Sequence, residues 1–416
     1  MRKTISGFSY GLLLMVGLVY FGLYQLFIPA PSAKAASIKL VCKNNPFQGD
    51  VLFITDLDQP LEFLIDGELV ADVPEGYTLA STQCRWTVSS GTIEEQGIRC
   101  RWSHPKPGVQ NIHVSGTATL SPPASNEILP WKKSEKTVAF ESSLRCLVPL
   151  KVEKLENGKI NGYEVGVYPD PTKTKDLSLI ENGTTAARVR IHALRYSPPK
   201  LFYEVTPQTF PLRIFKHYTL GDFDLDPRFL PLTYPRYIAV HPDLLKKIDR
   251  LEQEMIAAGV RLTKFKLIYG FRSPAYNIGA WEKDKAASLK EPFSSHMYGM
   301  AADMIVDEDD NLIMDDLNHD GVIDLRDAQV LLDFVDRLDQ KLLAEGSELV
   351  GGAGIYPHHD YWERGETAQS PYVHMDVRGY TREDGSLIRW EGKDILGVLT
   401  QKNPYHLTGA IPKYPF

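Results

Sequence analysis

The sequence predicts an all-β sandwich over residues 37–148, followed by an α+β domain over residues 215–416. The first observation is a series of short apolar or alternating runs up to residue 148. Gly, Pro, Asn and Asp separate these runs at intervals of roughly 8 to 12 residues, which is typical of a sandwich. The second observation is that, after residue 240, helix-periodic segments alternate with strand-like ones. A chain of 416 residues is long enough for two or three domains with hydrophobic cores.

Composition and charge limit the classes of partner. The chain is 43% hydrophobic and 24% charged, and its formal net charge is -7. Binding to nucleic acid needs a basic surface, so this balance argues against nucleic acid as the main partner. Small molecules and polymeric substrates remain open.

The first 36 residues read as an export segment, with a basic start at Arg2 and Lys3 and no charge from residue 4 to residue 33. Ala33 and Ala35 have the spacing of a signal-peptidase site. The apolar run is about 20 residues long, which suffices to span a bilayer. The segment is therefore a signal peptide or a signal anchor that tethers the chain through residues 8–28. In both interpretations the rest of the protein is exported to the periplasm or cell envelope.

Cysteine usage agrees with export. The four cysteines all lie between the export segment and residue 148: Cys42, Cys84, Cys100 and Cys146. An even number of cysteines in an oxidising compartment predicts two disulfides. Four cysteines allow three pairings, among which the sequence does not choose. Because no Cys-x-x-Cys pair occurs, a cysteine-based zinc site is not expected.

The region before residue 215 carries no catalytic motif. Its stretch "CRWTVSSGTIEEQGIRCRWSHPKPGVQNIHVSGTATL" resembles the polycystic-kidney-disease type of immunoglobulin-like module. That resemblance implies a spacer or a wall-binding module; alternatively, the region only stabilises the chain. Residues 149–214 are predicted to be a β-rich connecting region, with Asn-Gly turn signals on either side of "KI" at 159–160.

The C-terminal part contains two predicted helices. Over residues 241–260, apolar residues recur at helical spacing, namely Leu244, Leu245, Ile248, Leu251 and Ile256. Residues 325–346 form the second. Strands are expected in "KFKLIYGFRSP" (264–274), "ADMIV" (302–306) and "YVHMDVRG" (372–379), and a glycine-rich turn in "GGAGIYP" (351–357).

Three residues form a candidate metal site: His296, Asp303 and His374. Catalytic zinc takes imidazole and carboxylate ligands and keeps one position open. Gly299 lets the backbone bend between the first two residues, and Asp303 leads an apolar strand. The period-two alternation of a strand places His374 and Asp376 on one face.

The segments "SSHMYGMAAD" (294–303) and "YVHMD" (372–376) resemble zinc peptidases that cleave cell-wall peptides. These are the D-alanyl-D-alanine carboxypeptidase and periplasmic murein endopeptidase group, peptidase family M15 and its relatives. The shared frame is Ser-x-His-x-x-Gly-x-Ala-x-Asp, followed later by His-x-Asp. "HYTLGDF", "YGFRSPAYN", "GGAGIYP" and "IRW" add further similarity, so the resemblance covers roughly residues 215–392. It implies an α+β zinc peptidase domain with an antiparallel sheet and flanking helices.

The resemblance implies an exported zinc metallopeptidase that hydrolyses peptide bonds in peptidoglycan stem peptides or crosslinks. Zinc, held by His296, Asp303 and His374, would polarise a peptide carbonyl and lower the pKa of a water molecule. Arg272 would bind a substrate carboxylate or the developing oxyanion. Ser294 and the next serine are expected to orient His296 or to cap its turn.

The general base is less defined, because Pro371 and Tyr372 stand where relatives carry it. Asp376 is the candidate, either as the base or as an acceptor that holds the His374 imidazole. His358 and His359 are second choices. A chain without a base would be a non-catalytic protein that binds cell-wall peptides on a degenerate peptidase fold.

Residues 316–327, "DLNHDGVIDLRD", fit a twelve-residue calcium loop with Gly321 at its sixth position. The expected ligands are Asp316, Asn318, Asp320, the Val322 carbonyl, Asp324 and Asp327. This loop, inserted between Asp303 and His374, is expected to brace the active-site sheet. The alternatives are an acidic surface loop or, with the β module, a calcium-braced adhesion protein.

Overall fold

The computed structural model describes residues 36–37, 39–66, 77–122, 135–168, 197–224, 233–283, 294–359, 370–379, 381–382 and 384–391. Over these residues the protein is a β-rich mixed fold with three α-helices. Residues 1–35 of the predicted export segment, including the tether at residues 8–28, lie outside the described residues. No helix of the described part is long and apolar enough to cross a membrane.

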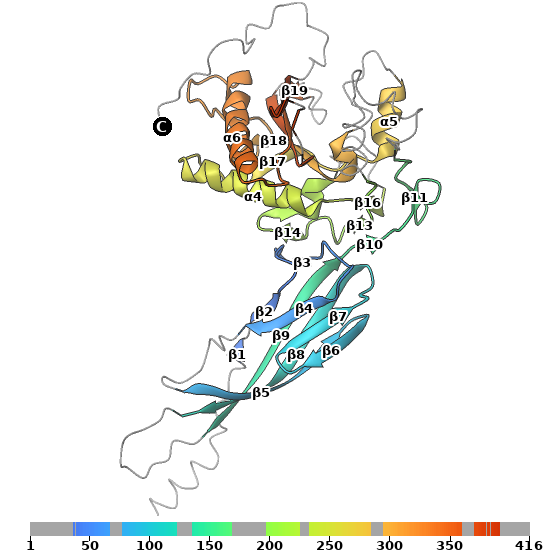
Figure 1. The fold of residues 1–416 in the computed structure, drawn as a ribbon, viewed down its shortest axis with the longest axis vertical. Helices are drawn as coiled ribbons and strands as arrows, with labels where there is room; N and C mark the ends of the chain where they lie inside the picture. Colours follow the sequence, from blue (N-terminus) through green and yellow to red (C-terminus); the bar gives the residue numbers. More distant parts are fainter. Residues whose placement is uncertain are drawn as a thin grey trace, which may run out of the picture.

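Two sheets that share one hydrophobic core form the N-terminal part (Figure 1). The first sheet has the order β1 (Ala36–Ser37), β9 (Lys136–Val148), β8 (Gly108–Ser121) and β5 (Thr78–Val88), with β3 (Leu52–Phe53) also beside β9. The second has the order β2 (Lys39–Cys42), β4 (Leu61–Asp66), β7 (Arg99–Ser103) and β6 (Thr92–Gln96).

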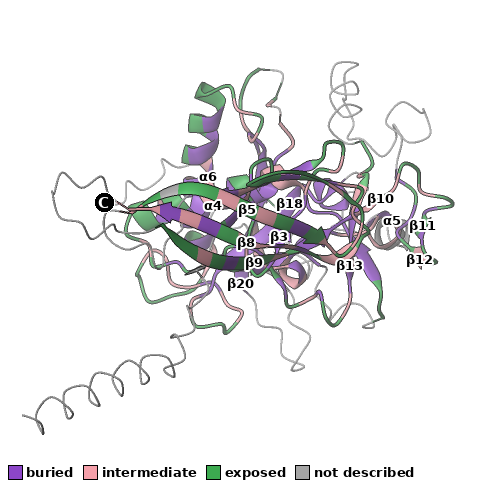
Figure 2. Cartoon of the chain, turned by 90° about the horizontal axis from the view of Figure 1, so that it is seen from below, coloured by how far each residue is buried: buried purple, intermediate pink, exposed green. Residues whose placement is uncertain are grey.

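Side-chain alternation explains why these segments are strands. Buried and exposed residues alternate along much of β8 and β9, and the bands are visible in Figure 2. Alternation of this kind places one face of each strand in the core and the other in solvent. The core between the two sheets contains the fully buried side chains of Phe63, Trp86 and Trp102.

A five-stranded sheet is the centre of the C-terminal part. Its order is β17 (Phe265–Tyr269), β18 (Ala301–Val306), β20 (Ser370–Asp376), β19 (Gly352–His359) and β21 (Ile388–Glu391). Neighbouring strands are antiparallel except for the parallel pair β19 and β21. Three helices belong to this part: α4 (Pro242–Ala257), α5 (Pro274–Lys283) and α6 (Leu325–Ala344). Helix α6 packs on β19, β20 and α4 (Figure 1).

Both long helices follow the sequence prediction and begin with identifiable caps. His241 caps α4, with Pro242 at the first helical position; Asp324 and Asp327 form a capping box on α6. Four of the five predicted apolar residues of α4 are buried, but Ile256 is 52% exposed. Met255, one position earlier, is buried in its place.

The predicted connecting region belongs to the C-terminal core. Its described strands are β10 (Leu150–Lys151), β11 (Lys159–Ile160), β12 (Tyr163–Glu164), β13 (Leu201–Val205) and the start of β14 (Arg213–Phe215). A three-stranded sheet joins β10 and β13 to β16 (Arg236–Ile238), while β14 pairs with β15 (Tyr218–Thr219) ahead of a 3-10 turn, η1 (Leu220–Phe223). On β13, Tyr203 stacks on Phe53 at 4.2 Å and donates a hydrogen bond to the Ile54 carbonyl, which joins the N-terminal sheets to this core.

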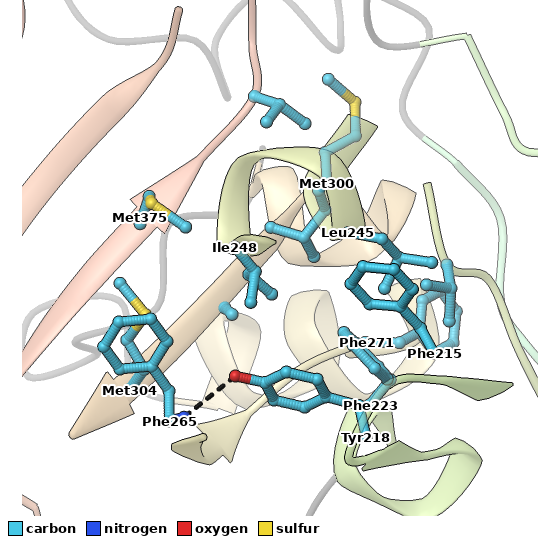
Figure 3. Close-up of a cluster of buried hydrophobic side chains, with 14 of the residues drawn as sticks. Phe215, Tyr218, Phe223, Leu245, Ile248, Phe265, Phe271, Met300, Met304 and Met375 are labelled. Carbon is cyan, nitrogen blue, oxygen red and sulfur yellow. Dashed lines mark hydrogen bonds between the residues drawn. The ribbon is translucent and has the colours of Figure 1, made fainter. Parts of the chain in front are cut away.

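Figure 3 shows the core between the large sheet and α4. Met304 and Met375 reach it from the sheet, and Ile248 from the helix. The Tyr218 hydroxyl accepts a hydrogen bond from the Phe265 N–H at 2.9 Å, drawn as a dashed line. The same hydroxyl donates to Glu252 at 2.7 Å, so this buried polar group has both partners.

One local prediction was wrong. Residues 351–357 were expected to form a turn, but Gly352–His359 is strand β19. The glycines permit close packing inside the sheet instead. A Cβ atom on Gly351 would lie 1.7 Å from the Asp376 carbonyl, and one on Gly354 would lie 2.3 Å from the Trp390 indole nitrogen.

The four cysteines are thiols in this structure, so the two predicted disulfides are not formed in it. Cys42, Cys100 and Cys146 are buried in the core between the N-terminal sheets, and Cys84 packs against that core.

Candidate metal centre

One row of residues across the large sheet positions most of the site. Asp303 on β18 is directly opposite His374 on β20. Tyr269 on β17 extends this row on one side, and Gly354 and Trp390 extend it on the other. Strand pairing therefore brings together the two predicted ligands that are 71 residues apart in the chain.

The third ligand comes from outside the sheet. His296 lies in η3 (Ser295–Tyr298), a single 3-10 turn. The Ser294 side chain caps this turn by accepting a hydrogen bond from the His296 N–H, as predicted. Gly299 ends it with φ +67°, where a Cβ atom would lie 2.3 Å from the Ala239 carbonyl. Only glycine fits such a left-handed, closely packed position, which fixes where the turn meets the sheet.

The three ligand atoms converge. Nε2 of His296 is 3.2 Å from Oδ1 of Asp303 and 3.1 Å from Nδ1 of His374. Asp303 Oδ1 and His374 Nδ1 are 2.7 Å apart. Tetrahedral zinc would hold such atoms about 3.3 Å from one another. Two of the three separations are near that value, and all three side chains are buried, so small shifts would complete the ligand set.

Hydrogen bonding on the far side of each ring determines which nitrogens carry protons. His296 Nδ1 is 2.6 Å from the Gly270 carbonyl, which only accepts, so Nδ1 carries the proton. His374 Nε2 is 3.3 Å from the Asp376 carboxylate and carries its proton for the same reason. In the neutral rings, the other two nitrogens therefore direct lone pairs at the Asp303 carboxylate. Two neutral imidazole nitrogens and a carboxylate that converge in this way could hold a metal ion.

The pKa shift of His296 favours a neutral ring, whereas the pKa shift of His374 favours a protonated one. Burial and the nearby Arg272 charge lower the pKa of His296 to about 4, which keeps the ring neutral near pH 7. Burial raises the pKa of Asp303, but the charges and hydrogen bonds of His296 and His374 outweigh it and hold that pKa well below its usual range. Burial also lowers the pKa of His374, and hydrogen bonds to Asp303 and Asp376 reverse the direction.

Arg272 lies beside the ligand set. Its guanidinium is 3.7 Å from the second carboxylate oxygen of Asp303, and its side chain is 13% exposed. The ring of Tyr269 lies 5.5 Å from the guanidinium carbon. Among the described residues, the buried Nε of Arg272 has no hydrogen-bond partner, so it retains a donor for a further acceptor. The structure thus places Arg272 at the site, as the sequence predicted.

Asp376 lies behind His374. Its carboxylate accepts hydrogen bonds from the His374 ring, the Ser295 hydroxyl at 3.3 Å and the Gly352 N–H at 2.7 Å, and it pairs with Arg378. It is fully buried and contacts the ring edge opposite the ligand nitrogen. This geometry suits the acceptor role that the sequence left open, because the carboxylate fixes the tautomer of His374.

Sequence reasoning missed an aromatic wall next to the site. The Trp390 ring lies 5.1 Å from the His374 ring, and its indole nitrogen donates to the Tyr356 hydroxyl at 2.9 Å. Tyr356 in turn stacks on Tyr372 at 4.6 Å. The short motif "IRW" contained the signal, but only the parallel pairing of β21 with β19 brings Trp390 to His374.

The predicted calcium loop is well formed as a turn. Gly321 has φ +82°, as the sixth position requires, and Asp316 accepts the N–H groups of Asp320 and Gly321. The Asp324 side chain caps α6, and Arg326 pairs with Asp320 and Asp324. Calcium binding in this loop stays a prediction.

In the described part there are two clusters of three His or Asp residues, and within each cluster the ligand atoms lie within 4.8 Å of one another. One is His296, Asp303 and His374; the other is Asp307, Asp309 and Asp315, just before the predicted loop. His358 and His359 lie at the end of β19, but their side chains are outside the described part.

Comparisons with family models, curated proteins and solved structures find no match to this chain. The resemblance to zinc peptidases therefore depends on the motifs, and the metal centre depends on its geometry.

Proposed function

We propose that this protein is an exported zinc metallopeptidase that hydrolyses peptide bonds in peptidoglycan stem peptides or crosslinks. One observation carries the proposal. Two imidazole nitrogens and one carboxylate oxygen, supplied by His296, His374 and Asp303, converge within 2.7 to 3.2 Å of one another. Two histidines and one carboxylate are the ligand set of several catalytic zinc sites, which keep a fourth position for water or substrate.

Four residues around the metal ligands would have separate roles. Asp376 holds the His374 ring so that Nδ1 faces the site. The Gly270 carbonyl holds the His296 ring so that Nε2 faces the site. Arg272 offers its Nε–H and its charge to a substrate carboxylate or to the oxygen that becomes negative during hydrolysis. Trp390 covers one side of His374 and limits access of bulk water there.

Zinc, when bound, supplies Lewis-acid polarisation of the scissile carbonyl and lowers the pKa of a water molecule toward neutrality. The same donor set also holds iron(II) in non-haem oxygenases, so metal content must be measured for both elements. The predicted export segment and the net charge of -7 favour an envelope polymer as substrate.

The test uses the purified full-length protein and digested peptidoglycan fragments. We expect wild type to release peptides or free D-amino acids, as detected by mass spectrometry, and a chelator to abolish the release. Adding zinc back should restore it. His296→Ala should be inactive, whereas the matched variant His113→Ala, at a half-buried position on β8 in the N-terminal part, should be fully active. Release that persists in the metal-free protein would contradict the proposal.

A second candidate is a protein that binds wall peptides without cutting them. It is favoured by the position of Asp376, whose carboxylate is buried and already engaged by His374, Ser295 and Arg378. In that case wild type would release nothing from peptidoglycan yet retain wall fragments in a pull-down, and His296→Ala would lose them.

A further inference from the structure

The four cysteines are distributed evenly over the two N-terminal sheets. Cys84 on β5 and Cys146 on β9 belong to the first sheet, and Cys42 on β2 and Cys100 on β7 belong to the second. All four side chains contact the core between the sheets. A disulfide needs Cα atoms roughly 4.4 to 6.8 Å apart, so strand register can exclude pairings.

Pairing within each sheet is excluded. Cys42 is opposite Phe63, and Phe63 is opposite Cys100, so the two cysteines are two strands apart in one row. That separation is about 9 to 10 Å. In the other sheet, Cys84 aligns through Gly116 with Phe140. Cys146 is six residues further along the same strand, which is about 20 Å.

Register also places Cys42 beside Cys146. Strand β1 runs parallel to β9, with Ser37 level with Glu141. Cys42 is five residues after Ser37, and Cys146 is five residues after Glu141. The chain crosses to the second sheet after β1, and β2 continues in contact with β9. Both thiols therefore reach the same level of the core.

Cys84 lies over the end of the second sheet that carries Cys100. Its Sγ donates a hydrogen bond to the Gly97 carbonyl at 2.8 Å, and Trp86 on the same strand donates to that carbonyl at 3.0 Å. Gly97 is in the turn that joins β6 to β7, three residues before Cys100. The other cross-sheet pairing joins Cys42 to Cys84 and Cys100 to Cys146. It would require the Cys84 side chain to move away from the turn at Gly97.

The electrostatic couplings follow the same two pairs. Burial raises the pKa of Cys100 to about 12, and among the nearby groups Cys84 adds to that rise. Burial raises the pKa of Cys146 as well, and there Cys42 is the group that adds to it.

We propose that the exported protein carries two inter-sheet disulfides, Cys42–Cys146 and Cys84–Cys100. For each pair, two S–H bonds break and one S–S bond forms. Two protons and two electrons pass to the disulfide of an oxidising thiol–disulfide exchange protein, which becomes a dithiol. Buried thiols with raised pKa values are poor nucleophiles, so the exchange belongs to folding and not to the finished fold. The two bonds link two of the three long strands of the first sheet, β5 and β9, to the second sheet.

Peptide mapping of wild type tests the pairing without any variant. The full-length protein is produced in an oxidising bacterial periplasm, purified without reductant, denatured with an alkylating agent and digested. Mass spectrometry should find no alkylated cysteine and two linked peptide pairs, 42 with 146 and 84 with 100. Four alkylated cysteines, or any other linkage, would overturn the proposal.

Two single variants give an independent check. Cys42→Ser should leave Cys146 open to alkylation and the Cys84–Cys100 link intact. Cys84→Ser should leave the Cys42–Cys146 link intact and leave only Cys100 open to alkylation. If Cys42→Ser instead exposes Cys84 or Cys100, the pairing is wrong. For wild type, reductant should lower the melting temperature by roughly 10 °C, since removal of native disulfides is strongly destabilising.

Discussion

Asp303 and His374 face each other across neighbouring strands, and Oδ1 of Asp303 lies 2.7 Å from Nδ1 of His374. The backbone hydrogen bonds of β18 and β20 fix both residues, so two of the three candidate ligands are part of the sheet itself. His296 is different, because a single 3-10 turn outside the sheet carries it.

The first prediction is that His296→Ala loses most of its metal. Wild type should contain about one zinc ion per chain, bound by three protein ligands. With only Asp303 and His374 left, the site should no longer retain zinc through dialysis. Elemental analysis measures this, and His113→Ala serves as the matched control because it removes a half-buried histidine on β8, outside the candidate site. Zinc retained by His296→Ala at the wild-type level would sink the assignment, and stoichiometric iron in wild type would replace zinc.

The second prediction concerns the loop at 316–327. An ion that binds only the folded state raises stability by about 2.7 kcal/mol when present at a hundred times its dissociation constant. Wild type should therefore melt roughly 5 to 10 °C higher in calcium than in a calcium-selective chelator. Asp316→Ala with Asp320→Ala should remove that difference. The control variant changes two exposed acids on or next to β9, Glu135→Ala with Glu141→Ala, and should keep it. Equal melting temperatures for wild type in both conditions would argue against a bound ion.

The three candidate ligands could be identified from the sequence because each is in a short local motif. Ser294, His296, Gly299 and Asp303 all fall within ten residues, and the alternation around His374 identifies its strand. The helices were predictable because their apolar periodicity is long and regular. These features depend on neighbours along the chain, which is the information that a single sequence carries most directly.

The surroundings of the ligands were not predictable, because they depend on strand order. Trp390 reaches His374 only because β21 pairs with β19, and the gap in the side-chain layer at Gly354 leaves room for the ring. From sequence alone, glycines at 351, 352 and 354 favour a turn. In the structure Gly352 and Gly354 are strand residues and Gly351 directly precedes the strand, and Asp376, Arg378 and Trp390 pack closely against the three glycines.

The third prediction tests that packing. Gly354→Ala would place a Cβ atom 2.3 Å from the indole nitrogen of Trp390. Overpacking of this kind costs roughly 1 to 3 kcal/mol, so the free energy of unfolding should fall by about that amount. Denaturant unfolding measures it. In a Trp390→Ala background, the same Gly354→Ala change should cost much less, because the clashing ring is gone. An equal cost in both backgrounds would show that Gly354 has another role.

The last prediction assigns Asp376. In Asp376→Asn, the amide can still accept from the Gly352 N–H through its oxygen, but its NH2 group then faces the His374 ring. The ring would have to protonate Nδ1, which removes the lone pair aimed at the site. A role in holding the ring therefore predicts a loss of roughly 10- to 100-fold in zinc affinity and recovery of turnover in excess zinc.

A general base behaves differently. If Asp376 is the general base, Asp376→Asn would keep its zinc, but turnover would fall by a factor on the order of 10² to 10⁴ and excess zinc would not restore it. Measuring zinc affinity and kcat at saturating zinc separates the two roles, with exposed Asp384→Asn as the control. Because Asp376 contacts the ring edge opposite the ligand nitrogen, we expect the first outcome. Unchanged turnover with unchanged zinc affinity would exclude both roles, and His358 and His359 would then be the next residues to substitute.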